Sequence, residues 1–94
     1  MKNSDIARVF QDMADLLERK KDNIFKIRAY RRAAQVIERL SKEMEDMLNE
    51  GEDFQKIPGI GEAIAKKSAE LIMTGKIEAH ERLKAEFPEG TKKV

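Results

Sequence analysis

The chain has 94 residues, of which 40% are hydrophobic and 39% are charged, so it holds one domain with a core near the lower size limit for independent folding. Nineteen basic and eighteen acidic residues leave a net charge of +1, which excludes both a uniformly basic histone-like binder and an acidic disordered tail. With no cysteine and one histidine, His80, the sequence excludes disulfide scaffolds, zinc fingers and thiol nucleophiles. No apolar run approaches the roughly 18 residues of a membrane span, so we expect a soluble, intracellular protein without membrane partners.

Apolar spacing in the N-terminal half predicts two amphipathic helices joined by a short loop. Hydrophobic side chains recur at i, i+3, i+4 and i+7 between residues 6 and 17, with Asn3 or Ser4 placed to cap this helix. Asp22-Asn23 supply turn and capping chemistry for a second helix from about Ile24 to Leu40. Small alanines on the second helix would let a neighbouring helix pack closely against it.

Three shorter segments complete the pattern. Ser41 is expected to cap a third helix over about residues 44–48. Helical spacing returns over residues 64–72 and again over residues 77–87, and Pro88 would end the last helix. No stretch alternates apolar and polar residues over the length of a strand, so the sequence predicts an all-α fold, a small bundle of four to five helices.

Charge is unevenly distributed along the chain. Residues 19–39 contain eight basic and two acidic side chains, whereas residues 43–53 contain six acidic side chains and no basic one. At about 100° per residue, one side of the second helix gathers a mostly basic set within an arc of about 100°: Arg28, Arg31, Arg32, Gln35 and Arg39. This face could bind an anionic partner, or it could be a solvated surface paired with the acidic third helix.

The sequence Ile57-Pro58-Gly59-Ile60-Gly61 joins a short turn over residues 53–56 to the next helix. Pro58 would end that turn, and Gly59 and Gly61 permit positive φ and the close approach of another backbone. A plain turn between two helices is the alternative interpretation of the same residues.

The same hairpin offers hydrogen-bond donors and acceptors to a ligand. The amides of Gly61, Glu62 and Ala63 would lie at the N-terminus of the next helix, where unpaired donors and the helix dipole favour a phosphate. Carbonyl oxygens turned outward could also hold a monovalent cation, Na⁺ or K⁺, that bridges to a phosphate oxygen. The candidates for these oxygens are those of Gln55, Ile57 and Ile60.

Three segments resemble, in the right order, the N-terminal domain of family X DNA polymerases, the DNA polymerase beta kind. MKNSDIARVFQDMADLLE resembles the opening helix of bacterial and archaeal members, NIFKIRAYRRAAQVIERL the second helix, and IPGIGEAIAKKSAELIMTGKIE the helix-hairpin-helix motif. The resemblance implies one helical domain over residues 1–88, with the helix-hairpin-helix motif at about residues 53–74. Residues 89–94 are expected to form a frayed tail.

The function implied by this resemblance is DNA binding in DNA repair, including base excision repair. Such a domain grips the phosphate backbone and the 5'-phosphate side of gapped DNA without sequence preference. A polymerase catalytic domain would need several hundred further residues, so this chain alone cannot polymerise DNA. It would act as part of a family X polymerase, beside that enzyme's catalytic domains, or as a free-standing relative, without a required cofactor and in the cytoplasm at the nucleoid.

Lys67 is the candidate catalytic residue that the resemblance implies. In the family, a lysine on the helix after the hairpin attacks the aldehyde of an abasic 5'-deoxyribose phosphate, forms a Schiff base and releases the sugar by β-elimination. Lys67 lies three residues after Ile64, at the edge of that helix's apolar stripe, where partial desolvation would favour the neutral nucleophile. Glu70, one turn further on, would favour the charged amine instead.

The family's phosphate pocket is matched in part. Lys26 and Tyr30, at i and i+4 of the second helix, match a lysine and a tyrosine that contact the 5'-phosphate in relatives. Ala63 stands where the family has a phosphate-binding lysine, and Glu62 places a carboxylate near the proposed anion site. Lys66 could restore positive charge there or pair with neighbouring carboxylates.

Three functions are therefore open from the sequence. The chain could be a nucleic-acid-binding module, an abasic-site lyase acting through Lys67, or a protein-interaction domain in which the hairpin is only a turn. The first predicts binding that is independent of sequence and weakens steeply with salt.

Overall fold

The computed structural model describes residues 1–88, and the expectation about the tail over residues 89–94 lies outside them. The described chain forms five α-helices and one short 3-10 helix: α1 (Asn3–Lys20), α2 (Ile24–Arg39), α3 (Met44–Asn49), η1 (Phe54–Lys56), α4 (Glu62–Thr74) and α5 (Glu78–Glu86). No strand occurs between residues 1 and 88, and the predicted all-α fold is confirmed.

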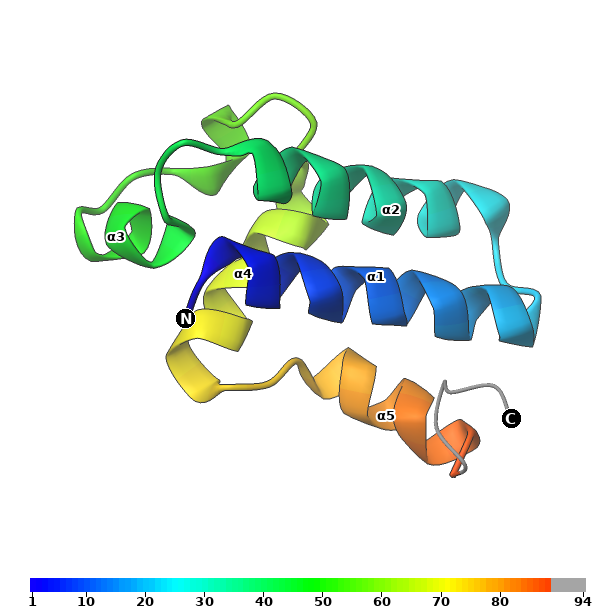
Figure 1. The fold of residues 1–94 in the computed structure, drawn as a ribbon. Helices are drawn as coiled ribbons and strands as arrows, with labels where there is room; N and C mark the ends of the chain where they lie inside the picture. The colour runs from blue at the N-terminus through cyan, green and yellow to red at the C-terminus, as the bar shows by residue number, and fades with distance from the viewer. Residues whose placement is uncertain (89–94) are drawn as a thin grey trace.

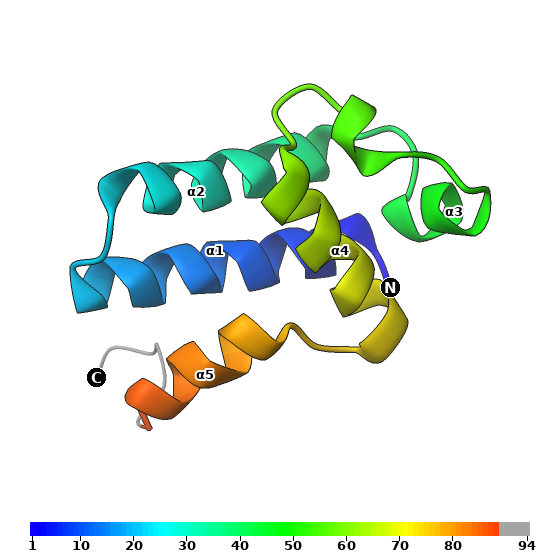
Figure 2. The same ribbon diagram turned by 180° about the vertical axis from the view of Figure 1, so that it is seen from behind.

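The helices are arranged around α1. Helices α1 and α2 run antiparallel side by side, α3 lies beyond one end of this pair, and α5 lies on the other side of α1 (Figure 1). Seen from behind, α4 crosses the pair and carries the chain from the hairpin above α2 to the start of α5 (Figure 2). The hairpin is thereby held at the C-terminal end of α2. Across residues 1–88, no helix is long and apolar enough to cross a membrane.

The core lies where α2, α4 and α5 meet α1. Phe10 of α1 is fully buried and stacks on Tyr30 of α2, with ring centroids 5.9 Å apart. Ala33 and Ala34 are buried on the same side of α2, and their small side chains allow α1 to pack closely. Burying a side chain of Phe10's size stabilises the fold by about 1.5–3 kcal/mol.

Helix capping agrees with the sequence-based prediction at α2 and differs from it at α1 and α3. Asn23 caps α2 as predicted, because its Oδ1 accepts hydrogen bonds from the amides of Phe25 at 2.7 Å and Lys26 at 3.3 Å. Neither Asn3 nor Ser4 caps α1, since both lie inside the helix. The N-cap of α1 is Lys2.

Asn3 instead connects α1 to α3. Its side chain is 5% exposed; Oδ1 accepts from the Met44 amide at 2.8 Å, and Nδ2 donates to the Lys42 carbonyl, also at 2.8 Å. Asn3 therefore satisfies a backbone donor at the start of α3, which is why Ser41 is not needed there. The N-cap of α3 is Glu43, so the predicted cap at Ser41 is wrong.

Two polar contacts attach the first half of α5 to the rest of the fold. The Glu70 carboxylate of α4 accepts a hydrogen bond from the Glu78 amide at 2.8 Å, at the start of α5. His80 is buried, with its Nε2 2.6 Å from the Asp12 carboxylate of α1. Glu70 thus binds the backbone at the start of α5, a contact that the sequence did not suggest.

Candidate nucleic-acid interface

The hairpin between η1 and α4 is packed against α2. The Ile60 amide donates to the Ile57 carbonyl at 3.0 Å, and both side chains are buried. Gly59 has φ +95°, a conformation that favours glycine. A Cβ there would lie 3.0 Å from Val36 Cγ2 and 3.2 Å from Arg32 Nε, so glycine also provides the space that seats the hairpin on α2.

Gly61 differs from Gly59. Its φ of −90° and ψ of −176° are open to any residue, and a Cβ built on it meets nothing within 4 Å. Gly61 therefore does not use the positive φ that glycine permits, and the fold itself does not require glycine there. Gly61 is the N-cap of α4 and leaves the approach to that helix's N-terminus open.

The N-terminus of α4 has unused donors. Within the described part of the chain, no acceptor pairs with the amides of Gly61, Glu62 or Ala63, and α4 has no side-chain cap. The first backbone bond of this helix runs from the Ala65 amide to the Gly61 carbonyl, at 2.9 Å. Free amides combined with the positive end of the helix dipole form an anion site.

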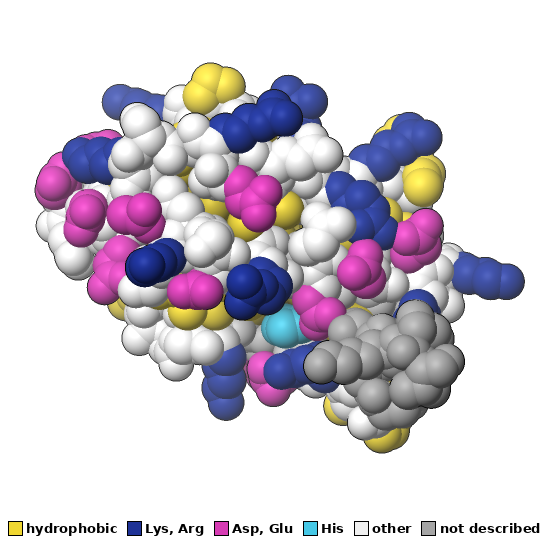
Figure 3. Space-filling model, viewed as in Figure 1, with side chains coloured by type: hydrophobic (Ala, Val, Ile, Leu, Met, Phe, Trp, Pro, Cys, Tyr) yellow, Lys and Arg dark blue, Asp and Glu magenta, His cyan; other side chains and the backbone are white. Residues whose placement is uncertain are grey.

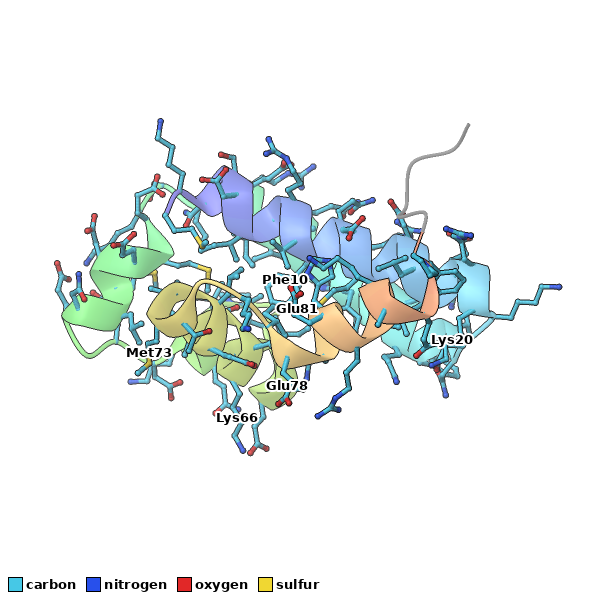
Figure 4. The ribbon with its side chains drawn as sticks, turned by 90° about the horizontal axis from the view of Figure 1, so that it is seen from below. Phe10, Lys20, Lys66, Met73, Glu78 and Glu81 are labelled. Carbon is cyan, nitrogen blue, oxygen red and sulfur yellow. The ribbon has the colours of Figure 1, made fainter. Side chains whose placement is uncertain are left out.

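Glu62 and Lys66 sit at the edge of this anion site and pair with each other. Lys66 Nζ lies 3.2 Å from the Glu62 carboxylate, and both side chains are largely exposed. Figure 4 shows the Lys66 side chain extending outward from α4. The pair reduces the local negative charge of Glu62.

Arg31 does not belong to the exposed basic face of α2. Its guanidinium donates to Asp15 at 2.9 Å and to Glu18 at 2.5 Å, both on α1, and these hydrogen bonds, that to Asp15 above all, raise the pKa of Arg31. Arg31 therefore joins α2 to α1, and its place in a DNA-binding face is not supported.

The other members of that face are exposed, and we call Arg28, Arg32, Gln35 and Arg39 the basic ridge. Among the residues that the structure describes, no carboxylate pairs with any of its three arginines. In a chain of 19 basic and 18 acidic residues, three adjacent unpaired guanidiniums are positive charge available to an external anion.

The acidic residues around α3 have their own partners. Lys42 Nζ lies 2.5 Å from Glu50 and 2.6 Å from Glu52, which raises the pKa of Lys42 and lowers that of Glu50. The N-terminal amine pairs with Glu45, which raises the pKa of that amine. Figure 3 shows acidic side chains gathered at the α3 end and basic ones along the edge formed by α2. Between residues 1 and 88, no ion pair joins α3 to the basic ridge. The structure therefore gives no support to the alternative in which α3 neutralises that face.

A groove lies between the basic ridge and the hairpin. Its volume is about 340 Å³, and we call it the ridge–hairpin groove. It is lined by Arg32, Gln35, Val36, Arg39, Leu40, Ile57 and Pro58. The structure thus brings α2 and the hairpin, which the sequence indicated separately, into one continuous surface.

A second concavity of about 220 Å³ lies between α1, α2 and α5. Three cations line it, Lys20, Lys26 and Arg82, and we call it the cationic pocket. Two carboxylates share it: Asp22 lies 3.7 Å from Lys26, and Glu86 lies 3.1 Å from Lys20.

Tyr30 forms part of the wall of the cationic pocket, and burial raises the pKa of its hydroxyl. Lys26 and Tyr30 are therefore brought together as their spacing predicts. The sequence did not indicate Lys20 and Arg82 as residues of this pocket, because they reach it from α1 and α5 through the packing of these helices. Phe25, 73% exposed at the start of α2 beside Lys26, does not line this pocket.

Lys67 lies apart from both concavities. It is half-buried on α4 and lines neither the ridge–hairpin groove nor the cationic pocket. The structure therefore does not place the candidate nucleophile in one cavity with Lys26 and Tyr30.

The hairpin carbonyls were the candidate cation ligands. Between residues 1 and 88, no backbone amide donates to the carbonyl of Gln55 or Ile60, and the Ile57 carbonyl accepts only the Ile60 amide. These neutral oxygens fit the preference of a hard monovalent cation.

A family model described as a helix-hairpin-helix domain matches residues 1–77, and the chain belongs to that family. The chain is also 34% identical, over 90 residues and 96% of its length, to the DNA polymerase/3'-5' exonuclease PolX of Bacillus subtilis (strain 168). It spans 15% of that relative's length. The resemblance to family X polymerases is confirmed, and this relationship supports a role in DNA binding.

Proposed function

We propose that this domain binds the phosphate backbone of DNA without sequence preference, favouring gapped or 5'-phosphorylated DNA in repair. One observation carries the proposal: the hairpin that leads into the free amides of α4 is packed against the basic ridge, whose arginines pair with no carboxylate in the described part of the chain. Arg32 connects the two, since its Nε lies 3.2 Å from the Cβ position of Gly59 at the hairpin.

The hairpin amides and the ridge arginines would each contribute to DNA binding in a different way. Amides at a helix N-terminus bind a phosphate oxygen through fixed donors, which positions the strand. Arginines neutralise further phosphates and release counterions, so the logarithm of the binding constant falls by about 0.9 per phosphate for each unit of log salt. We therefore expect steep salt dependence and little dependence on base sequence.

The test of backbone binding is a salt series on gapped DNA with three variants. Arg32→Ala and Arg39→Ala should each reduce the salt slope by about 1. Arg8→Ala is the matched control, because Arg8 is exposed on α1, where it lies 3.9 Å from Asp5. Unchanged slopes for both ridge variants, or an equal loss for Arg8→Ala, would remove the ridge from the interface.

The cationic pocket is the proposed site for the terminal 5'-phosphate. Lys20, Lys26 and Arg82 supply the charge, and the Tyr30 hydroxyl offers a hydrogen bond at the wall. Gapped DNA with a 5'-phosphate should bind more tightly than the same DNA without it, and Lys26→Ala should narrow the difference. Equal affinity of the wild-type domain for both DNAs would contradict end recognition.

Two further elements complete the proposal. Na⁺ or K⁺ at the carbonyls of Gln55, Ile57 and Ile60 would bridge the hairpin to a phosphate oxygen. Binding to DNA would place the domain at the nucleoid, where it would act beside the catalytic domains of a family X polymerase.

Lyase activity is a second candidate, favoured by the absence of an ion pair at Lys67 among residues 1–88, although Lys67 does not line the cationic pocket. The residue Lys67 is half-buried and has no ion pair within residues 1–88, while the nearby Glu70 binds the start of α5. An amine in that state can form a Schiff base with an abasic-site aldehyde. Borohydride should trap a covalent adduct with the wild-type domain and with Lys66→Ala, and no adduct with Lys67→Ala; an adduct on Lys67→Ala would move the nucleophile elsewhere.

A further inference from the structure

The ridge–hairpin groove has a mixed lining that phosphate binding alone does not explain. Its rim is polar and exposed, formed by Arg32, Gln35 and Arg39. The rest of its wall is apolar, with Val36 and Leu40 half-buried and Ile57 and Pro58 contributed by the hairpin. A phosphate needs donors and positive charge only, whereas this wall offers contact area to a flat, weakly polar group.

The groove is also large enough for more than a phosphate. Its volume of about 340 Å³ falls at the lower end of the range of about 300–1,000 Å³ found for small-ligand pockets. Arg32 and Arg39 are two helical turns apart on α2, which corresponds to about 10 Å along the helix. The space between them can therefore hold a sugar and a base as well as the phosphate that joins them.

The groove is continuous with the hairpin, which indicates how a sugar, its base and the adjoining phosphate would enter it. The Arg32 guanidinium lies against Gly59, next to the free amides at the N-terminus of α4. A strand held at those amides passes Arg32 first and then the groove. Within the groove, the Gln35 amide can both donate and accept hydrogen bonds, as the edge of any base requires.

We propose that the ridge–hairpin groove binds one unpaired nucleotide of the DNA. Its phosphate lies toward Arg32 and Arg39, and its base lies against Val36, Leu40 and Pro58 with its edge toward Gln35. This inference rests on the proposed function, because the hairpin must hold the strand. It assigns the domain a preference for DNA that contains an unstacked base, independent of which base that is.

The test compares two gapped DNAs of equal charge. Both have a one-nucleotide gap with a 5'-phosphate, and they differ only in whether the unpaired nucleotide carries a base or a tetrahydrofuran abasic analogue. We expect the wild-type domain to bind the base-containing DNA on the order of fivefold more tightly, the low end for contact with one unstacked base. The Gln35→Ala and Pro58→Ala variants should each lose most of that preference.

A control and a second readout separate the possible failures. Gln11→Ala, a matched change at an exposed position of α1, should keep the preference, and circular dichroism should show that every variant is folded. Equal affinity of the wild-type domain for both DNAs with its salt dependence intact would overturn the nucleotide site and leave backbone binding standing. Loss of salt dependence would overturn the proposed function itself. A full preference retained by both groove variants would show that the base binds elsewhere.

Discussion

Replacing Gly59 by alanine tests whether the hairpin is seated on α2 as the structure shows. The substitution adds one methyl group at a residue with φ +95°, where a Cβ would lie 3.0 Å from Val36 Cγ2 and 3.2 Å from Arg32 Nε. Arg32 can move aside, since its side chain is long and exposed. Val36 is β-branched and packed against the core, so it yields less easily.

The expected cost has two parts. An alanine held at this φ costs about 1–3 kcal/mol in backbone strain. Crowding against Val36 adds about 1–2 kcal/mol, within the range for overpacking a well-packed site. The sum, about 2–5 kcal/mol, is a large share of the about 5–15 kcal/mol that holds a typical domain folded. At about 4–8 °C per kcal/mol for a domain of this size, the melting temperature should fall by about 8–40 °C.

Thermal and urea unfolding followed by circular dichroism measure this cost against two other glycines. Gly51→Ala carries the strain of φ +77° in open space and should cost only about 1–2 kcal/mol. Gly61→Ala has ordinary backbone geometry and open space, so its stability should change by less than about 1 kcal/mol. If Gly59→Ala were no worse than Gly51→Ala, the contact with Val36 would be absent, and the seating of the hairpin on α2 would be refuted.

Two other predictions concern the core. Asn3→Ala leaves the Met44 amide and the Lys42 carbonyl without partners, and it should lower the free energy of unfolding in urea by about 2–4 kcal/mol. The control Ser4→Ala, at an exposed position, should lower it by less than about 0.5 kcal/mol. Equal effects of the two variants would contradict the link between α1 and α3. Tyr30 is the single tyrosine in a chain without tryptophan, so ultraviolet absorbance reports its ionisation directly. Its pKa should lie above the ordinary 10.0. Because the unfolded chain releases this proton first, the contribution of Tyr30 to stability should be constant below pH 10.0 and fall as pH rises toward the folded pKa; a folded-state midpoint at or below 10.0 would refute its burial.

The parts of the fold that sequence predicts are those set by nearby residues. The start of α2 follows from Asn23, whose side chain binds amides two and three residues further on. The failure at Asn3 has the opposite cause: its acceptor oxygen serves an amide 41 residues away, and no local pattern carries that information. The pairing of Arg31 was missed for the same reason, because helical spacing places Arg31 beside Arg28 and Arg32 but does not show that Asp15 of α1 faces it.

In the candidate site, too, the features set by neighbouring residues could be predicted and those set by packing between helices could not. The bend of the hairpin and the free amides of α4 follow from the order of residues, since a helix N-terminus without a capping side chain exposes donors wherever it lies. The cationic pocket could be predicted only by its half on α2, where Lys26 and Tyr30 are one turn apart. Lys20 and Arg82 reach it from α1 and α5, and the ridge–hairpin groove forms because the hairpin before α4 is packed against the C-terminal half of α2.

The distribution of ion pairs explains why positive charge remains on one surface of a nearly neutral chain. Lys42 forms ion pairs with Glu50 and Glu52, the N-terminal amine with Glu45, and Arg31 with Asp15 and Glu18. These pairs either are local or connect helices, and none extends to Arg28, Arg32 or Arg39. Exposed pairs of this kind contribute little to stability, about 0–1 kcal/mol each. Their larger effect is to keep carboxylates away from the basic ridge, so that an approaching phosphate meets guanidiniums that have no internal competitor among the described residues.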